Sequence, residues 1–180
     1  MRTPLALVLV VATAFYLSQA HAHTFIYNLE NGTPVFRVSF PDGWRLDLDF
    51  DPPDEGIDAP PPPRVVEAIP KDGAKLWLGM WAISEIGDIR DAREYFDSLK
   101  EFLFSDVETV EIGDEDLNGM PSRFFRGSAK KGNEPVDWAI LLFRTGPETV
   151  AALMYIGIPE AWRQHADELT AIVDSVSPAN

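Results

Sequence analysis

The chain has 180 residues, a length typical of one domain, and carries 29 Asp and Glu against 15 Lys and Arg, a formal net charge of −14. With no cysteine and only three histidines, it can form no disulfide scaffold or thiolate metal site and offers little for a histidine-built catalytic centre. An acidic surface repels nucleic-acid phosphates and anionic lipids, so we expect no nucleic-acid partner and no docking of basic residues on a membrane.

We expect residues 1–22 to be a secretory signal peptide. A single arginine precedes an apolar run over residues 5–17, and a polar stretch then ends in an alanine-x-alanine motif. This order is typical of a cleaved leader, and the run is shorter than the ~20 residues that a membrane-spanning helix needs. Cleavage after Ala22, or after Ala20, would give a secreted or periplasmic chain without a membrane anchor. Residues 23–180 are then expected to form one domain.

Alternating apolar and polar side chains predict strands in the first half of the chain. Asn31-Gly32 and the Pro-Asp-Gly sequence at 41–43 are typical of tight turns between strands. Residues 51–63 are rich in aspartate and proline, which predicts an exposed, stiff loop because proline cannot donate to a sheet. The strands expected around these features are residues 24–30, 35–40, 44–50, 64–69 and 75–83.

The second half of the chain predicts two helices with strands between them. Apolar residues at helical spacing follow Asp88, a suitable N-cap, and continue to Leu103. Pro159 suits the first position of a last helix, whose apolar stripe includes His165 and continues to Val176. The four strands expected between the helices are residues 107–112, 122–129, 136–143 and 149–156.

Two of the expected strands, residues 75–83 and 138–143, are apolar on both faces, which is typical of the middle of a sheet covered on both sides. Short hairpin connections favour antiparallel pairing. The two helices and the N-terminal hairpin would supply the covers. The sequence therefore predicts an α+β fold, in which an antiparallel β-sheet is flanked by two main helices as a layered α/β/α sandwich.

Three motifs follow one another along the chain: Phe40-Pro41-Asp42-Gly43-Trp44, then Leu117-Asn118-Gly119-Met120-Pro121 with Arg123-Phe124-Phe125-Arg126-Gly127, and last Val173-Asp174-Ser175-Val176-Ser177-Pro178. Together and in this order, they resemble the PsbP-like family over about Phe25 to Pro178. The resemblance implies the PsbP-like fold. It also implies a role in binding other macromolecules, because the family includes the extrinsic photosystem subunit, a Ran-binding nuclear-transport factor and many bacterial secreted or chaperone-like proteins. It implies no catalytic residues and no cofactor.

Two features are candidate metal sites. Cleavage after Ala22 would expose His23, whose amine and imidazole suit Cu(II), and cleavage after Ala20 would place the same histidine third in the chain. An acidic run of six carboxylates suits Ca²⁺, but Pro52 stands where a calcium loop needs glycine, and alternation along a strand already explains its first members as a solvated face. The acidic candidates are Asp47, Asp49, Asp51 and Asp54, followed by Glu55 and Asp58.

Two further features are candidate binding surfaces. Trp77 and Trp81 point to one face of a strand with Gly79 between them, a notch that could hold a ligand or be covered by a packed helix. A locally basic hairpin is either a solvated surface or an electrostatic docking patch for a partner protein. Its cations are Arg123, Arg126, Lys130 and Lys131.

A catalytic function has little support in the sequence. Ser128 and Lys131 match the S-x-x-K pattern, but they lie on an expected strand rather than at a helix start. We therefore expect a non-catalytic domain that binds a partner protein. A metal-binding or small-ligand-binding module is the alternative, and an unrecognised hydrolase is the less favoured one.

Overall fold

The structure is a computed structural model that describes residues 22–48, 64–84, 87–90, 97 and 103–179. The predicted signal peptide, apart from Ala22, and the predicted loop over 51–63 lie outside the described residues, so both stay predictions. The helix predicted over 88–103 is described only in part. Its described helical residues are Ile89, Arg90, Asp97 and Leu103.

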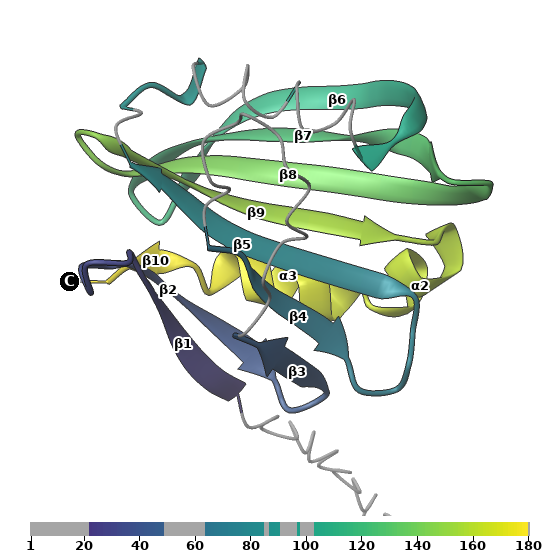
Figure 1. Cartoon of the computed structure of the whole chain (residues 1–180), viewed down its shortest axis with the longest axis horizontal. Helices are drawn as coiled ribbons and strands as arrows, with labels where there is room; N and C mark the ends of the chain where they lie inside the picture. Colours follow the sequence, from purple (N-terminus) through teal and green to yellow (C-terminus); the bar gives the residue numbers. More distant parts are fainter. Residues whose placement is uncertain (1–21, 49–63, 85–86, 91–96, 98–102, 180) are drawn as a thin grey trace, which may run out of the picture.

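A seven-stranded antiparallel sheet forms the body of the fold (Figure 1). Its strand order is β3-β4-β5-β9-β8-β7-β6, so the strands that were expected to be apolar on both faces, β5 and β8, lie inside the sheet. The strands are β3 (Trp44–Asp47), β4 (Val66–Pro70), β5 (Leu76–Ser84), β6 (Ser105–Leu117), β7 (Met120–Lys131), β8 (Glu134–Gly146) and β9 (Thr149–Gly157).

A small antiparallel sheet and two short helices complete the described fold. The small sheet has the order β1-β2-β10, and its first two strands form the hairpin predicted at Asn31-Gly32, where Gly32 has a φ of +82°. Pro159 occupies the start of α2, as predicted for the last helix. The elements are β1 (Ala22–Asn28), β2 (Pro34–Pro41), β10 (Ser177–Pro178), α2 (Pro159–Gln164) and α3 (Ala166–Asp174).

The large sheet has an apolar cluster on each face, which confirms the expected two-sided core. On one face, Leu78, Leu141 and Leu153 are fully buried under the small sheet, α2 and α3 (Figure 1). On the other face, Trp81 and Ile140 belong to a second cluster, against which Ile89 and Leu103 also pack. Burial on both sides explains why these strands are apolar at consecutive positions.

The α+β class and the antiparallel sheet are confirmed, but the layering differs from the predicted α/β/α sandwich. The described helices α2 and α3 lie on the same face as the small sheet, so one layer mixes strands and helices. The described chain is mostly strand and richer in sheet than a sandwich flanked by two main helices. The N-terminal hairpin recruits the C-terminal β10 as its third strand, a pairing of only two residues that periodicity does not reveal.

Several boundaries also differ from the predictions. The strand expected over 44–50 ends at Asp47, and Leu48, predicted to face inward, is 42% exposed. The strand expected over 107–112 extends to 13 residues as β6, because an edge strand exposed to solvent continues through polar residues. The last helix is broken at His165, whose φ of −105° and ψ of 14° separate α2 from α3 while the apolar stripe continues.

Tyr155 is a buried residue of β9 whose hydroxyl has no hydrogen-bond partner among the described residues. Burial raises the pKa of this hydroxyl above its usual value of 10.0. Because an unfolded chain would release the proton near pH 10 and the folded chain would not, the free energy of unfolding should fall as pH rises above about 10.

We therefore expect Tyr155→Phe to raise the free energy of unfolding by about 1 kcal/mol at pH 7 and to weaken its fall above about pH 10. Urea unfolding at neutral and alkaline pH measures both effects. Part of the alkaline fall should remain, because burial also raises the pKa of Tyr27. An alkaline fall equally steep in the wild type and the variant would show that Tyr155 does not cause it.

Candidate functional site

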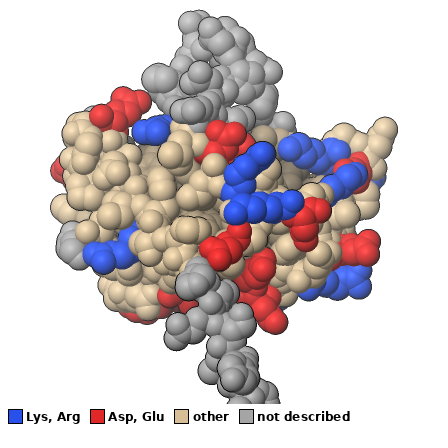
Figure 2. Space-filling view, turned by 90° about the horizontal axis from the view of Figure 1, so that it is seen from below, with Lys and Arg blue, Asp and Glu red and all other residues tan. Residues whose placement is uncertain are grey.

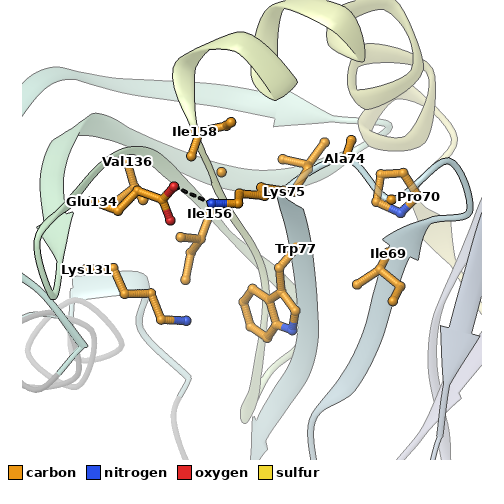
Figure 3. A pocket seen from close by; sticks show the side chains of 13 residues that line it. Ile69, Pro70, Ala74, Lys75, Trp77, Lys131, Glu134, Val136, Ile156 and Ile158 are labelled. Atoms are coloured by element: carbon orange, nitrogen blue, oxygen red, sulfur yellow. Dashed lines mark hydrogen bonds and ion pairs between the residues drawn. The ribbon is translucent and has the colours of Figure 1, made fainter.

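A groove of about 470 Å³ opens where the β4–β5 turn, the β7–β8 turn and the end of β9 meet (Figure 3). Apolar side chains form its floor, and charged side chains stand at its rim. We call it the Trp77 groove. The floor residues are Ile69, Pro70, Trp77, Val136, Ile156 and Ile158, and the charged residues are Lys75, Lys131 and Glu134.

Close backbone approach holds one wall of the Trp77 groove in place. Trp77 lies opposite Ile156 in the β5–β9 ladder, and the Ile158 N–H donates to the Lys75 carbonyl over 3.1 Å. A Cβ on Gly157 would stand 2.7 Å from Leu76 Cδ1 and 3.0 Å from the Lys75 carbonyl oxygen, so only glycine fits there without a shift. This wall of the groove therefore consists of the paired strands β5 and β9 and the link from β9 to α2.

Trp77 and Trp81 lie on the same face of β5, as predicted, but the space between them is not open. The ring of Trp77 lies over Gly79, and a Cβ on that glycine would overlap Trp77 Cη2. Trp81 is only 3% exposed, whereas Trp77 is half-buried and lines the groove. A ligand in the notch would have to displace the indole of Trp77, so the accessible aromatic surface is that of Trp77 alone.

Acidic neighbours on β6 partly balance the basic hairpin. Arg123 Nε lies 3.5 Å from Asp114 Oδ1, and Arg126 is exposed. Lys130 Nζ lies 2.6 Å from Asp106 Oδ2, and this hydrogen bond raises the pKa of Lys130. Figure 2 shows the same mixing more widely, with basic and acidic side chains interspersed over the face that it presents.

Lys131 is different, because it makes no ion pair with any residue that the structure describes and it lines the Trp77 groove. Figure 3 shows its side chain extended in the direction of the Trp77 ring. Lys75 Nζ and Glu134 Oε1, 2.5 Å apart, neutralise each other across the same groove. Ser128 and Lys131 are three positions apart on β7 and so point to opposite faces, which the S-x-x-K chemistry does not allow.

The structure places only some of the metal candidates. His23 is exposed on β1, and its Nε2 lies 2.9 Å from Asp42 Oδ1. Asp47 is the exposed last residue of β3, whereas Asp49, Asp51 and Asp54 lie outside the described residues. Within the described ranges, no three His, Asp or Glu side chains are grouped so that they could hold a metal ion. The copper and calcium sites stay predictions.

His165, predicted to lie on a buried helix stripe, is 7% exposed and sits at the break between α2 and α3. Its Nδ1 lies 2.8 Å from Glu168 Oε2, and its Nε2 lies 3.3 Å from Asp72 Oδ2. Trp44 Nε1 donates to the same Glu168 oxygen over 2.8 Å, and its ring packs edge-on against the imidazole. This cluster fastens the β2–β3 and β4–β5 turns to α3.

The second motif also fastens the C-terminal helix. Asn118, in the β6–β7 turn, has a positive φ of 52°. Its Nδ2 donates to the carbonyl oxygens of Asp174 (3.0 Å) and Val176 (2.6 Å). All three sequence motifs therefore meet at α3, away from the lining of the Trp77 groove. They explain the fold rather than a binding site.

Sequence reasoning identified Trp77 and Lys131 but assigned them to two separate features, and it missed the other members of the groove. Lys75, Glu134 and Ile158 follow three different turns or strand ends, and only the tertiary arrangement brings them together. One feature of the sequence could have indicated the groove. Each of these three residues lies next to a turn, and side chains next to turns can meet at the end of a sheet.

Comparisons with known proteins agree on the fold. No family model matches the chain, and no curated protein sequence matches it. The solution structure of cyanobacterial PsbP (CyanoP) from Synechocystis sp. PCC 6803 aligns at a TM-score of 0.61 and 10% identity, over 93% of this chain and 98% of that one. PA94 from Pseudomonas aeruginosa, a protein of unknown function and putative regulator, aligns at 0.51 and 11% identity, over 88% and 99%.

A Bacteroides thetaiotaomicron structure aligns at a TM-score of 0.53 and 10% identity, over 87% of this chain and 48% of that one. No helix within the described ranges is both long and apolar enough to cross a membrane. The alignment with CyanoP spans nearly the full length of both chains and agrees with the fold implied by the three motifs that meet at α3. The chain therefore has the PsbP-like fold.

Proposed function

We propose that the chain is a non-catalytic, secreted or periplasmic domain that binds a partner protein through the Trp77 groove, in an accessory or chaperone-like role. The observation that carries this proposal is the groove itself, in which a half-buried tryptophan and an aliphatic floor lie beside Lys131, a cation with no ionic partner among the described residues. In protein interfaces, a few buried anchor residues, tryptophan prominent among them, supply most of the binding energy, and a polar rim surrounds them.

Two further points support this proposal. The resemblance of the three sequence motifs to the PsbP-like family implies a role in binding other macromolecules, and PA94, which aligns with this chain, is described as a putative regulator. The predicted leader supports the secreted or periplasmic location, where such a domain would meet its partner.

The test places a photo-crosslinking amino acid at position 131 of the full chain expressed in its own host. The matched control carries it at Thr170, an exposed position on α3 away from the groove. One protein should crosslink at position 131 and not at position 170. That protein, identified and purified, should then bind directly to the mature chain, residues 23–180 after removal of the predicted leader.

Trp77→Ala should weaken that purified complex by about 10- to 100-fold, because buried aromatic anchors contribute most of an interface's affinity. Lys131→Glu, which alters only an exposed side chain, should weaken it without disturbing the fold. The control is Val110→Ala, since Val110 is 71% exposed on β6. Absence of a specific crosslink at position 131, or an affinity unchanged by both groove variants, would overturn the proposal.

A further inference from the structure

We propose that the Trp77 groove recognises one chemical pattern in its partner, a polypeptide segment in which a large apolar side chain lies beside a carboxylate. This inference rests on the proposed function and adds to it the chemistry of the partner. The size and floor of the groove, its charge and its open shape each support one part of the pattern.

The apolar part follows from the floor. About 470 Å³ lies within the range of ordinary ligand pockets, about 300–1,000 Å³. The surfaces that meet there are the half-buried indole of Trp77 and the side chains of Ile156 and Ile158. An aromatic or large aliphatic side chain would remove this apolar surface from water, and a polar side chain would lose hydrogen bonds to water in the same place.

The acidic part follows from the charges at the rim. Lys75 and Glu134 compensate each other at 2.5 Å, whereas Lys131 has no ionic partner among the described residues. Counting only the described residues, the groove thus carries one uncompensated positive charge, on a chain whose formal net charge is −14. A carboxylate beside the apolar anchor would complement this charge, and a second cation would be repelled by it.

The open side of the groove favours a polypeptide segment over a small molecule. From Lys131 to Pro135, every residue of the β7–β8 turn is exposed, and this turn forms one side of the groove. Small-molecule sites usually enclose most of their ligand, whereas an open groove leaves room for a chain to enter and leave. We therefore assign the occupant to a protein segment.

The test uses three fluorescein-labelled peptides and the mature chain. One peptide has Phe between Asp and Glu, the second has Phe between two Lys, and the third has Ala between Asp and Glu. Fluorescence polarisation should show at least tenfold tighter binding of the first peptide than of the other two. Lys131→Glu should abolish its advantage over the lysine peptide, and Lys71→Glu should preserve it, since Lys71 is exposed outside the groove lining.

Each outcome decides the inference. Equal binding of the acidic and basic peptides, binding unaffected by Lys131→Glu, or no binding of any peptide at about 1 mM would overturn it. If the crosslinked partner depends on Trp77 while the peptides show no preference for charge, the inference fails and the proposed function stands. If the partner does not depend on the groove, the proposed function fails whatever the peptides do.

Discussion

Trp44→Ala is expected to lower the free energy of unfolding by about 3–5 kcal/mol, the range for removing a large aromatic side chain from a core. Trp44 is 4% exposed, packs against Phe40 and His165, and donates to Glu168 over 2.8 Å. Its removal would leave a cavity under α3 and remove the hydrogen-bond donor to the Glu168 carboxylate, which is partly exposed. Urea unfolding followed by circular dichroism measures the loss.

Trp44→Phe separates the two contributions. It keeps most of the apolar contact and removes only the hydrogen bond, so we expect a loss of about 1–2 kcal/mol. In a double-mutant cycle with Glu168→Ala, which removes the acceptor, the two variants should be coupled, because each removes the same hydrogen bond. A Trp44→Ala loss below that of Trp44→Phe would contradict the packing role. Additive effects in the cycle would contradict the hydrogen bond.

Gly127→Ala is expected to lower the free energy of unfolding by about 3 kcal/mol, although it adds a single methyl group. A Cβ at Gly127 would overlap the carbonyl oxygen of Glu108 and stand 2.8 Å from its carbonyl carbon. Both atoms belong to the backbone of β6, next to irregularities in its pairing with β7, so no side chain can rotate away. The strand itself would have to move.

Gly113→Ala is the matched control, because Gly113 lies in β6 of the same sheet and a Cβ there would meet nothing within 4 Å. We expect it to change the free energy of unfolding by less than about 0.5 kcal/mol. Thermal unfolding of the two variants side by side makes the comparison. Similar losses from both substitutions would show that glycine flexibility, rather than close approach of β6 and β7, sets the effect at Gly127.

The strands of this fold could be predicted from sequence because their side chains alternate or are apolar on both faces. Residues 35–40 illustrate this, since Phe36, Val38 and Phe40, predicted to share a face, are all buried. The break of the last helix at His165 could not be predicted. The imidazole occupies a position in the apolar stripe, and the break shows only in the backbone angles of His165, a φ of −105° and a ψ of 14°.

The groove was less predictable than the fold, for a physical reason. Trp77 and Lys131 lie 54 positions apart in sequence, and neither carries a local signal that indicates the other. The aromatic pair on β5 suggested a notch, but sequence cannot show that the ring of Trp77 lies over Gly79. Motifs that determine a fold act locally, at turns and caps, whereas a binding surface depends on which turns converge.

The placement of the C-terminal segment has a consequence for the order of folding. Arg37 donates to the carbonyl of Pro178, and the Ser39 N–H donates to Ser175 Oγ, so the last strand and helix close against one of the first strands. During synthesis, the apolar face beneath α3 would have no helical cover until residues 159–178 had emerged. Folding of this core must therefore wait until residues 159–178 have been synthesised, and shorter chains would expose surfaces prone to aggregation.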